Sequence, residues 1–204
     1  TIPVGSLASL SSTDQRKPFS MITASRLATE KHIDWLVRAV VRAKEEIPEL
    51  SFDIYGKGGE EGKIRSLIDD LAASEYIKLK GHADLAEVYK NYEIYLSAST
   101  SEGFGLTLME AIGSGLTIIG FDVPYGNQTF VVEGKNGYLI PNSVDQVVDR
   151  IADAFSEKIV KVYRNHELES MRQASYARAE DFLTIRVEEA WRQLIEEVTH
   201  VKSV

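Results

Sequence analysis

Short apolar runs alternate with amphipathic stretches along most of this 204-residue chain, and this alternation restricts the fold more than any other feature. Six runs have the length and composition of buried strands. They are Phe19–Ala24, Leu50–Tyr55, Tyr76–Lys80, Ile94–Ala98, Thr117–Phe121 and Tyr138–Ile140. Strands that alternate with helices form a parallel sheet covered on both faces, so the sequence predicts an α/β fold.

The segments between the runs carry apolar residues at helical spacing. The sets are Ile33, Leu36, Val37, Val40 and Ile47 before Pro48; Ile64, Leu67, Ile68 and Leu71; Leu85 and Val88; Gly105–Gly113; Val144, Val147, Val148 and Ile151; and Trp191, Leu194, Ile195 and Val198. Parallel sheets of this kind bind ligands outside the carboxyl ends of their strands, at a topological switch point. The loops that leave the strands are therefore the places to search for a site.

Composition excludes several classes of function. The chain has 31 acidic and 23 basic residues, a net charge of −8, which argues against a nucleic-acid-binding or membrane-binding surface. It has no cysteine, so thiol catalysis and thiolate metal sites are excluded. No Asp-x-Asp pair occurs, and the histidines form no His-Glu-x-x-His motif. We expect neither a metal nor a cofactor.

The chain divides into three predicted parts. Residues 1–17 are rich in Ser, Thr, Pro and Gly without a sustained period, and they are interpreted as a linker. Residues 18–181 hold the alternating pattern and are predicted to form one domain. Residues 182–204 are predicted to be a separate C-terminal helix. The chain begins with Thr1 rather than Met, and we expect it to be a fragment of a longer protein.

A glycine-rich loop, Gly56–Gly62, follows the second predicted strand and precedes a helix. It fails the dinucleotide pattern, which would need Gly at Glu61, and it fails the P-loop pattern as well. Two interpretations stay open. The loop is either a flexible strand-to-helix turn or a loop whose amides approach a phosphate without either named motif.

The segment Ser101–Leu106 leaves the fourth strand and opens a helix. Gly103 and Gly105 allow close backbone approach, and free amides at a helix N-terminus form an anion site. Glu102 suits sugar hydroxyls, because an ionised carboxylate only accepts hydrogen bonds. Glu110 lies two helical turns further on, roughly 9–12 Å along an axis, where it suits a ribose. The alternatives are a dipole partner for Glu102 and a solvated helix face for Glu110.

Arg26 and Lys31 follow the first predicted strand. Both could converge on a diphosphate, Arg26 with its rigid fork of donors and Lys31 as a point charge. Ordinary surface charge is the alternative for two isolated basic residues.

Taken together, these motifs resemble the retaining glycosyltransferases of the GT-B fold, family 4. The resemblance runs in order through almost the whole chain, and the two glutamates separated by seven residues are its most specific part. The matching segments are Ser25-Arg26-Leu27 with Lys31, Tyr55–Gly58, Gly81, Glu102–Gly105, Glu110-Ala111, Gly115 and Gly134–Leu139. The resemblance implies a Rossmann-like parallel sheet flanked by helices, the C-terminal, nucleotide-sugar-binding half of a GT-B enzyme.

The resemblance also implies a role for each matching residue. Arg26 and Lys31 would hold the diphosphate as it leaves, with Glu102 as the third catalytic residue, and no metal is needed. The uracil would lie near Gly81-His82 and the loop after Tyr55, and the ribose would meet Glu110. The implied donor-binding residues are Gly56, Gly81, His82, Glu102, Gly103, Phe104, Gly105, Leu106 and Glu110.

A narrower resemblance involves Ser101–Leu116 and Asp122–Phe130. These segments are similar to the streptococcal accessory-Sec glycosyltransferases, which begin O-GlcNAc modification of serine-rich-repeat adhesins. The implied partners are a UDP-sugar, a missing N-terminal domain, a Ser/Thr-rich acceptor and a related co-activator subunit. The implied location is the cytoplasm, with peripheral membrane association through the missing part.

Three other functions stay open at this point. The chain could belong to a poly(glycerol-phosphate) glucosyltransferase or another sugar-nucleotide enzyme, such as an epimerase, of the same fold. It could be the non-catalytic co-activator, which would need no donor site. A flavodoxin-like interaction domain is the third alternative, and it leaves the ordered motifs unexplained.

Overall fold

The computed structural model describes residues 16–141 and 147–201, and it contains one sheet of six parallel strands. The strands are β1 (Ser20–Ala24), β2 (Ser51–Tyr55), β3 (Ile77–Gly81), β4 (Ile94–Ser97), β5 (Thr117–Phe121) and β6 (Gly137–Ile140). Their order across the sheet is β3-β2-β1-β4-β5-β6, and every neighbouring pair is parallel. This is the Rossmann strand order.

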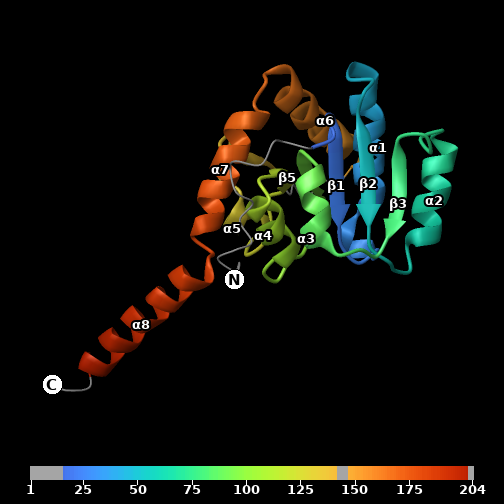
Figure 1. Cartoon of the computed structure of the whole chain (residues 1–204). Helices are drawn as coiled ribbons and strands as arrows, with labels where there is room; N and C mark the ends of the chain where they lie inside the picture. The colour runs from blue at the N-terminus through green and yellow to red at the C-terminus, as the bar shows by residue number, and fades with distance from the viewer. Residues whose placement is uncertain (1–15, 142–146, 202–204) are drawn as a thin grey trace.

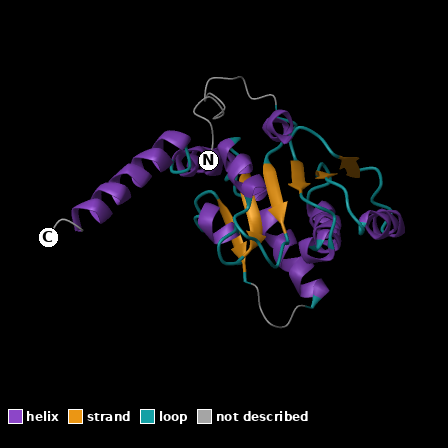
Figure 2. Cartoon of the chain, turned by 90° about the horizontal axis from the view of Figure 1, so that it is seen from below, coloured by secondary structure: helices purple, strands orange, loops and turns teal. Residues whose placement is uncertain are grey.

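Helices cover both faces of the sheet (Figures 1 and 2). They are α1 (Ile33–Glu46), α2 (Glu61–Asp70), α3 (Leu85–Val88), α4 (Leu106–Gly113), α5 (Asn127–Phe130), α6 (Val148–Arg164), α7 (Leu168–Glu180) and α8 (Thr184–Val201), with short 3-10 turns η1 (Thr29–Lys31) and η2 (Tyr89–Asn91). One apolar core joins α1, α2 and α6 to the sheet, and a second joins α3, α4 and α5 to the opposite face.

The two cores follow from the two-residue period of a strand. Met21 belongs to the core under α1, whereas its neighbour Ile22 belongs to the core under α4. Ile119 and Ile118 of β5 divide in the same way. Strands buried on both faces must be apolar throughout, which is why the sequence shows continuous apolar runs.

The order of the strands fixes where a ligand can bind. The chain moves outward from β1 to β2 and β3, and then returns to place β4 on the other side of β1. The loops that leave β1 and β4 therefore diverge to opposite faces and leave a crevice at the carboxyl edge. Arg26 and Lys31 follow β1, and Glu102 follows β4, so the fold brings the predicted site residues to this crevice.

Every predicted strand is confirmed, and no strand end differs by more than one residue from its predicted position. The sequence analysis did not predict η1, η2, α5 or α7 as separate elements. Helix α7 was hidden because its buried residues are Met171, Ser175 and Ala179, a face too polar and small to stand out. The predicted helix through Val144 begins outside the described residues, and Val147 is the N-cap of α6 rather than part of it.

Helix α8 projects away from the sheet (Figure 1). Its apolar side chains are exposed, and Trp191 is the largest of them, with 61% of its surface accessible. No helix in residues 16–141 and 147–201 has the length and apolar character needed to cross a bilayer. The predicted linker lies mostly outside the described residues, and the predicted domain limits stay predictions.

Candidate functional site

Two adjoining cavities open at the carboxyl edge of the sheet, between β1 and its neighbours. Cavity 1, of about 360 Å³, lies between the loops after β1 and β4. Cavity 2, of about 590 Å³, lies between β1, β2 and the segment before α3. They share the lining residues Ala24, Ser25, Arg26 and Thr107, so one elongated ligand could occupy both.

Lys31 and Glu102 meet in cavity 1. The Lys31 Nζ lies 2.6 Å from Glu102 Oε1, and the two side chains are only 14% and 18% exposed. The same Nζ donates to the hydroxyl of Ser99 at 3.1 Å. A phosphate and a sugar hydroxyl would therefore meet a cation and a carboxylate that are already in contact.

Arg26 lies at the mouth shared by the two cavities. It pairs with Glu30 at 3.1 Å, and its side chain is 78% exposed. An exposed pair of this kind contributes about 0–1 kcal/mol, so a diphosphate can draw Arg26 inward at little cost.

The N-terminus of α4 faces cavity 1. Its N-cap, Gly105, adopts a left-handed conformation with φ of 85°, which a residue with a side chain rarely takes. Within the described chain, no hydrogen bond occupies the amides of residues 103–106. Phe104, Gly105 and Leu106 line the cavity. The helix start thus offers amide donors and a favourable dipole to an anion.

The glycine-rich loop has a role that neither interpretation anticipated. A Cβ on Gly56, whose φ is +133°, would lie 1.8 Å from the carbonyl oxygen of Ser25, and one on Gly58 would lie 2.2 Å from that of Leu27. The Gly56 amide donates to the carbonyl of Gly81 at 2.7 Å. These glycines therefore pin three strand-end loops together, and the Gly56 amide is committed to protein rather than to phosphate.

Buried hydroxyls tie cavity 1 to the sheet. Tyr95 donates to the carbonyl of Ala24 at 2.8 Å and lies 3.0 Å from the hydroxyl of Thr107. Burial raises the pKa of Tyr95 to about 12, so the phenol stays protonated and keeps its donor. This contact fixes the end of β1 against the first turn of α4.

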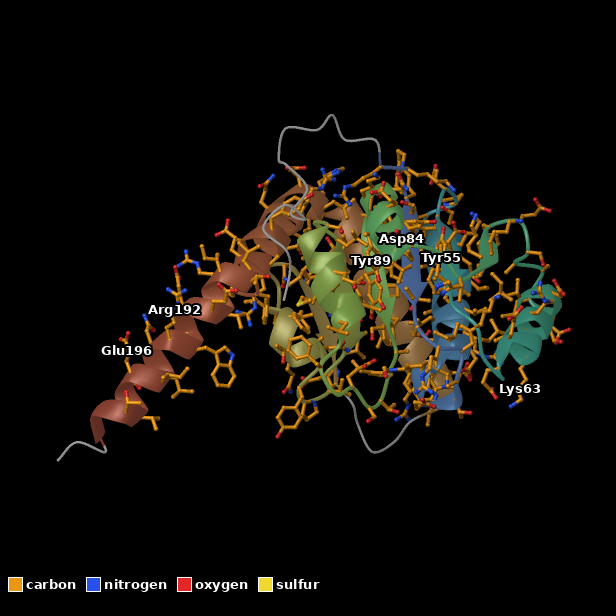
Figure 3. All side chains as sticks on the ribbon, turned by 60° about the horizontal axis from the view of Figure 1, so that its bottom comes forward. Tyr55, Lys63, Asp84, Tyr89, Arg192 and Glu196 are labelled. Carbon is orange, nitrogen blue, oxygen red and sulfur yellow. The ribbon has the colours of Figure 1, made fainter. Side chains whose placement is uncertain are left out.

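Glu110 lies on α4 but lines neither cavity. Burial raises the pKa of Glu110, and the nearby charge of Asp84 adds to this effect. Figure 3 labels Asp84, the N-cap of α3, and Tyr89, which begins the turn η2 after that helix. The predicted helical spacing from Glu102 to Glu110 was wrong, because α4 begins at Leu106 and Glu102 lies in the preceding loop.

A loop that follows β5 closes one side of Glu102. A Cβ on Gly126 would lie only 2.4 Å from the Glu102 Cβ. The adjacent Tyr125 has a positive φ of 63° and is 77% exposed. Gly126 therefore lies against the base of the Glu102 side chain, where a larger residue would displace it.

The structure brings most of the predicted site residues together. Cavity 1 takes Arg26, Lys31, Glu102, Phe104, Gly105 and Leu106, and cavity 2 takes Arg26, Gly56 and His82. Gly81, Gly103 and Glu110 line neither cavity. In the part of the chain that the structure describes, no cluster of acidic and histidine side chains could hold a metal.

The sequence analysis missed Ser99, Tyr95 and Gly126. Tyr95 lies within the fourth apolar run, and Ser99 follows the end of that run. A polar residue at such a position indicates that a loop begins, but it does not show which residue its side chain will contact. Gly126 lies in the segment that carried the narrower resemblance, but only the folded chain shows that it touches Glu102.

Fold and site define a Rossmann-like domain that offers cations, amides and a carboxylate to a nucleotide-sized ligand. The family model for glycosyl transferases group 1 matches residues 11–178. The chain therefore belongs to this glycosyltransferase family, and its GT-B relationship is confirmed.

Individual relatives narrow the comparison. The chain is 62% identical over 201 residues to the UDP-N-acetylglucosamine–peptide N-acetylglucosaminyltransferase GtfA subunit of Streptococcus pneumoniae, covering 98% of this chain and 40% of that protein. The crystal structure of the pneumococcal O-GlcNAc transferase GtfA with UDP and GlcNAc superposes with a TM-score of 0.87, at the same identity and coverage. A GtfA/B complex structure also has a TM-score of 0.87 and 62% identity, covering 91% of this chain and 37% of that one.

Proposed function

We propose that this chain is the C-terminal, donor-binding domain of a retaining family 4 glycosyltransferase that uses UDP-GlcNAc. The convergence of Lys31, Glu102 and the α4 N-terminus in one cavity carries the proposal. The 62% identity to a GtfA subunit supports UDP-GlcNAc as the donor. The chain spans about 40% of that relative, so the activity of the whole enzyme is part of the proposal.

The diphosphate would lie where the two cavities meet. Lys31, with 14% of its side chain exposed, would lie beside it, Arg26 can turn inward from its exposed pair with Glu30, and the amides of residues 103–106 add donors. Fixed cations and dipoles of this kind stabilise the charge that develops on a departing diphosphate. No metal and no cofactor are required in this arrangement.

The remaining parts of the donor follow from the same placement. The donor sugar would meet Glu102 in cavity 1, and the uridine would enter cavity 2 beside Gly56 and His82. The ribose would lie toward Glu110. We propose a same-face substitution with an oxocarbenium-like transition state, and we assign no protein nucleophile.

The rest of the enzyme is proposed from the resemblance. An N-terminal domain would complete the cleft, and the exposed apolar face of α8 would pack against it. The acceptor would be Ser or Thr of a serine-rich-repeat adhesin, modified in the accessory Sec system. The GtfA/B structure supports a related partner subunit. We place the enzyme in the cytoplasm, associated peripherally with the membrane through its other parts.

Calorimetric titration with UDP and UDP-GlcNAc tests the donor site on this chain, and a transfer assay tests the activity. We expect binding of both nucleotides and no transfer by this chain alone. No binding at millimolar UDP would refute the donor site, and it is the result expected of a non-catalytic co-activator. Turnover of the longer enzyme with glycerol-phosphate polymer but not with peptide would instead support a polyol-phosphate transferase.

A further inference from the structure

Ser99 occupies a central place between the two loops of cavity 1. Its side chain is buried, with 2% of the residue exposed. Its hydroxyl lies 2.9 Å from the carbonyl of Ser101, which can only accept. The hydroxyl proton is therefore committed to Ser101, and the oxygen lone pairs face the Lys31 ammonium 3.1 Å away.

This arrangement determines the orientation of the Lys31 ammonium. An ammonium group has three N–H donors. One is directed to Glu102 and one to Ser99. Within residues 16–141 and 147–201, no partner takes the third donor, which remains for a ligand in cavity 1.

A neighbouring contact strengthens the connection between the loops. Glu30 precedes Lys31 in the chain, and its carbonyl accepts a hydrogen bond from the amide of Thr100 at 3.2 Å. The Thr100 hydroxyl lies 3.4 Å from the Nε2 of His32, one residue after it. The loop after β4 thus holds Lys31 from both sides, and Ser99 contacts the charged end.

We propose that Ser99 is a positioning residue that orients Lys31 toward the donor diphosphate. The inference rests on the proposed function, because it gives Lys31 a phosphate to meet. Ser99 does not touch the ligand in this account, and its whole effect passes through the ammonium of Lys31. When the Ser99 hydroxyl is removed, the Lys31 ammonium keeps only Glu102 as a fixed partner and turns toward that carboxylate.

A double-mutant cycle on UDP affinity tests this directly. We expect Ser99→Ala to weaken UDP binding about tenfold, the usual size of a lost hydrogen bond to a charged group. In a Lys31→Met background the same substitution should change UDP affinity less than twofold, because the residue through which it acts is gone. Ser101→Ala is the matched control, since that side chain is exposed and its hydroxyl makes no hydrogen bond within the described residues.

The outcomes separate the inference from the proposed function. Ser99→Ala could lower UDP affinity equally with Lys31 present and in the Lys31→Met background, or it could leave UDP affinity unchanged when Lys31 is present. Either result would overturn the positioning role of Ser99 while leaving the donor site intact. Failure of the unsubstituted chain to bind UDP would refute the proposed function instead. A second measurement needs no ligand. The side-chain ¹⁵N resonance of Lys31 should be that of an ordered ammonium in the unsubstituted chain, and Ser99→Ala should change it because the ammonium becomes less ordered. An unchanged resonance would overturn the inference, and circular dichroism confirms folding of each variant.

Discussion

Replacing Gly126 with alanine should displace Glu102 and little else. The added Cβ would lie 2.4 Å from the Glu102 Cβ and 3.0 Å from its Cγ, so Glu102 must move by about 1 Å to reach an ordinary contact. A displacement of about 1 Å can lower a rate on the order of a hundredfold when it misplaces a reacting group. We expect kcat for transfer from UDP-GlcNAc by the longer enzyme to fall by roughly this factor.

Affinity for UDP itself should stay within about twofold in Gly126→Ala, because Lys31 retains its contact with Ser99. Initial rates of the longer enzyme and calorimetry of this chain give the two quantities. Gly59→Ala is the control, since a Cβ there would meet nothing within 4 Å. Full transfer activity in Gly126→Ala, or a loss of UDP affinity equal to the loss of rate, would refute the reasoning.

Four further predictions concern other parts of the molecule. In calorimetry, Glu110→Gln should lower the affinity for UDP about ten- to a hundredfold, whereas Glu102→Gln should lower only the affinity for UDP-GlcNAc. If both variants lose the same affinity for UDP, the assignments of the sugar to Glu102 and of the ribose to Glu110 are wrong. Asp84→Asn should move the raised pKa of Glu110 downward in a ¹³C NMR titration, because a like charge is removed. A raised folded-state pKa gives stability that is lost as pH rises through it, so Asp84→Asn should also flatten the pH dependence of unfolding in that range. Trp191→Ala should change the unfolding free energy of this chain by less than about 0.5 kcal/mol in a denaturant titration, because the side chain is 61% exposed. Treatment of the longer enzyme with EDTA should leave transfer intact, and a loss that Mn²⁺ or Mg²⁺ restores would contradict the role given to Arg26 and Lys31.

The fold was predictable from the sequence because buried parallel strands and amphipathic helices leave different periodicities. The six strands and their connecting helices appear in the expected order. Helix α7 was not predicted because its buried face includes Ser175, a polar residue. The Ser175 hydroxyl donates to the carbonyl of Leu116 at 2.7 Å, and hydrophobic periodicity cannot reveal such a contact. A polar residue on a buried face resembles a solvent-facing residue until its partner is known.

The site was predictable in its location and less so in its connections. The resemblance implied that Arg26, Lys31 and Glu102 share one site, and all three lie in loops that follow the carboxyl ends of predicted strands. The sequence could not show that Lys31 and Glu102 form an ion pair, because they are far apart in the chain. Nor could the sequence show why position 56 is a glycine. The carbonyl of Ser25 leaves no room for a side chain there, and no phosphate is needed to explain the residue.

The most direct test of the account is where UDP binds on this chain. Titration of a ¹⁵N-labelled sample with UDP should shift the amides of residues 103–106 and the side-chain signals of Arg26 and Lys31. The Lys31→Met variant should lose most of this affinity while its far-UV circular dichroism stays unchanged. Shifts confined to another surface, or UDP affinity that Lys31→Met does not alter, would contradict the claim that the crevice between β1 and β4 is the donor site.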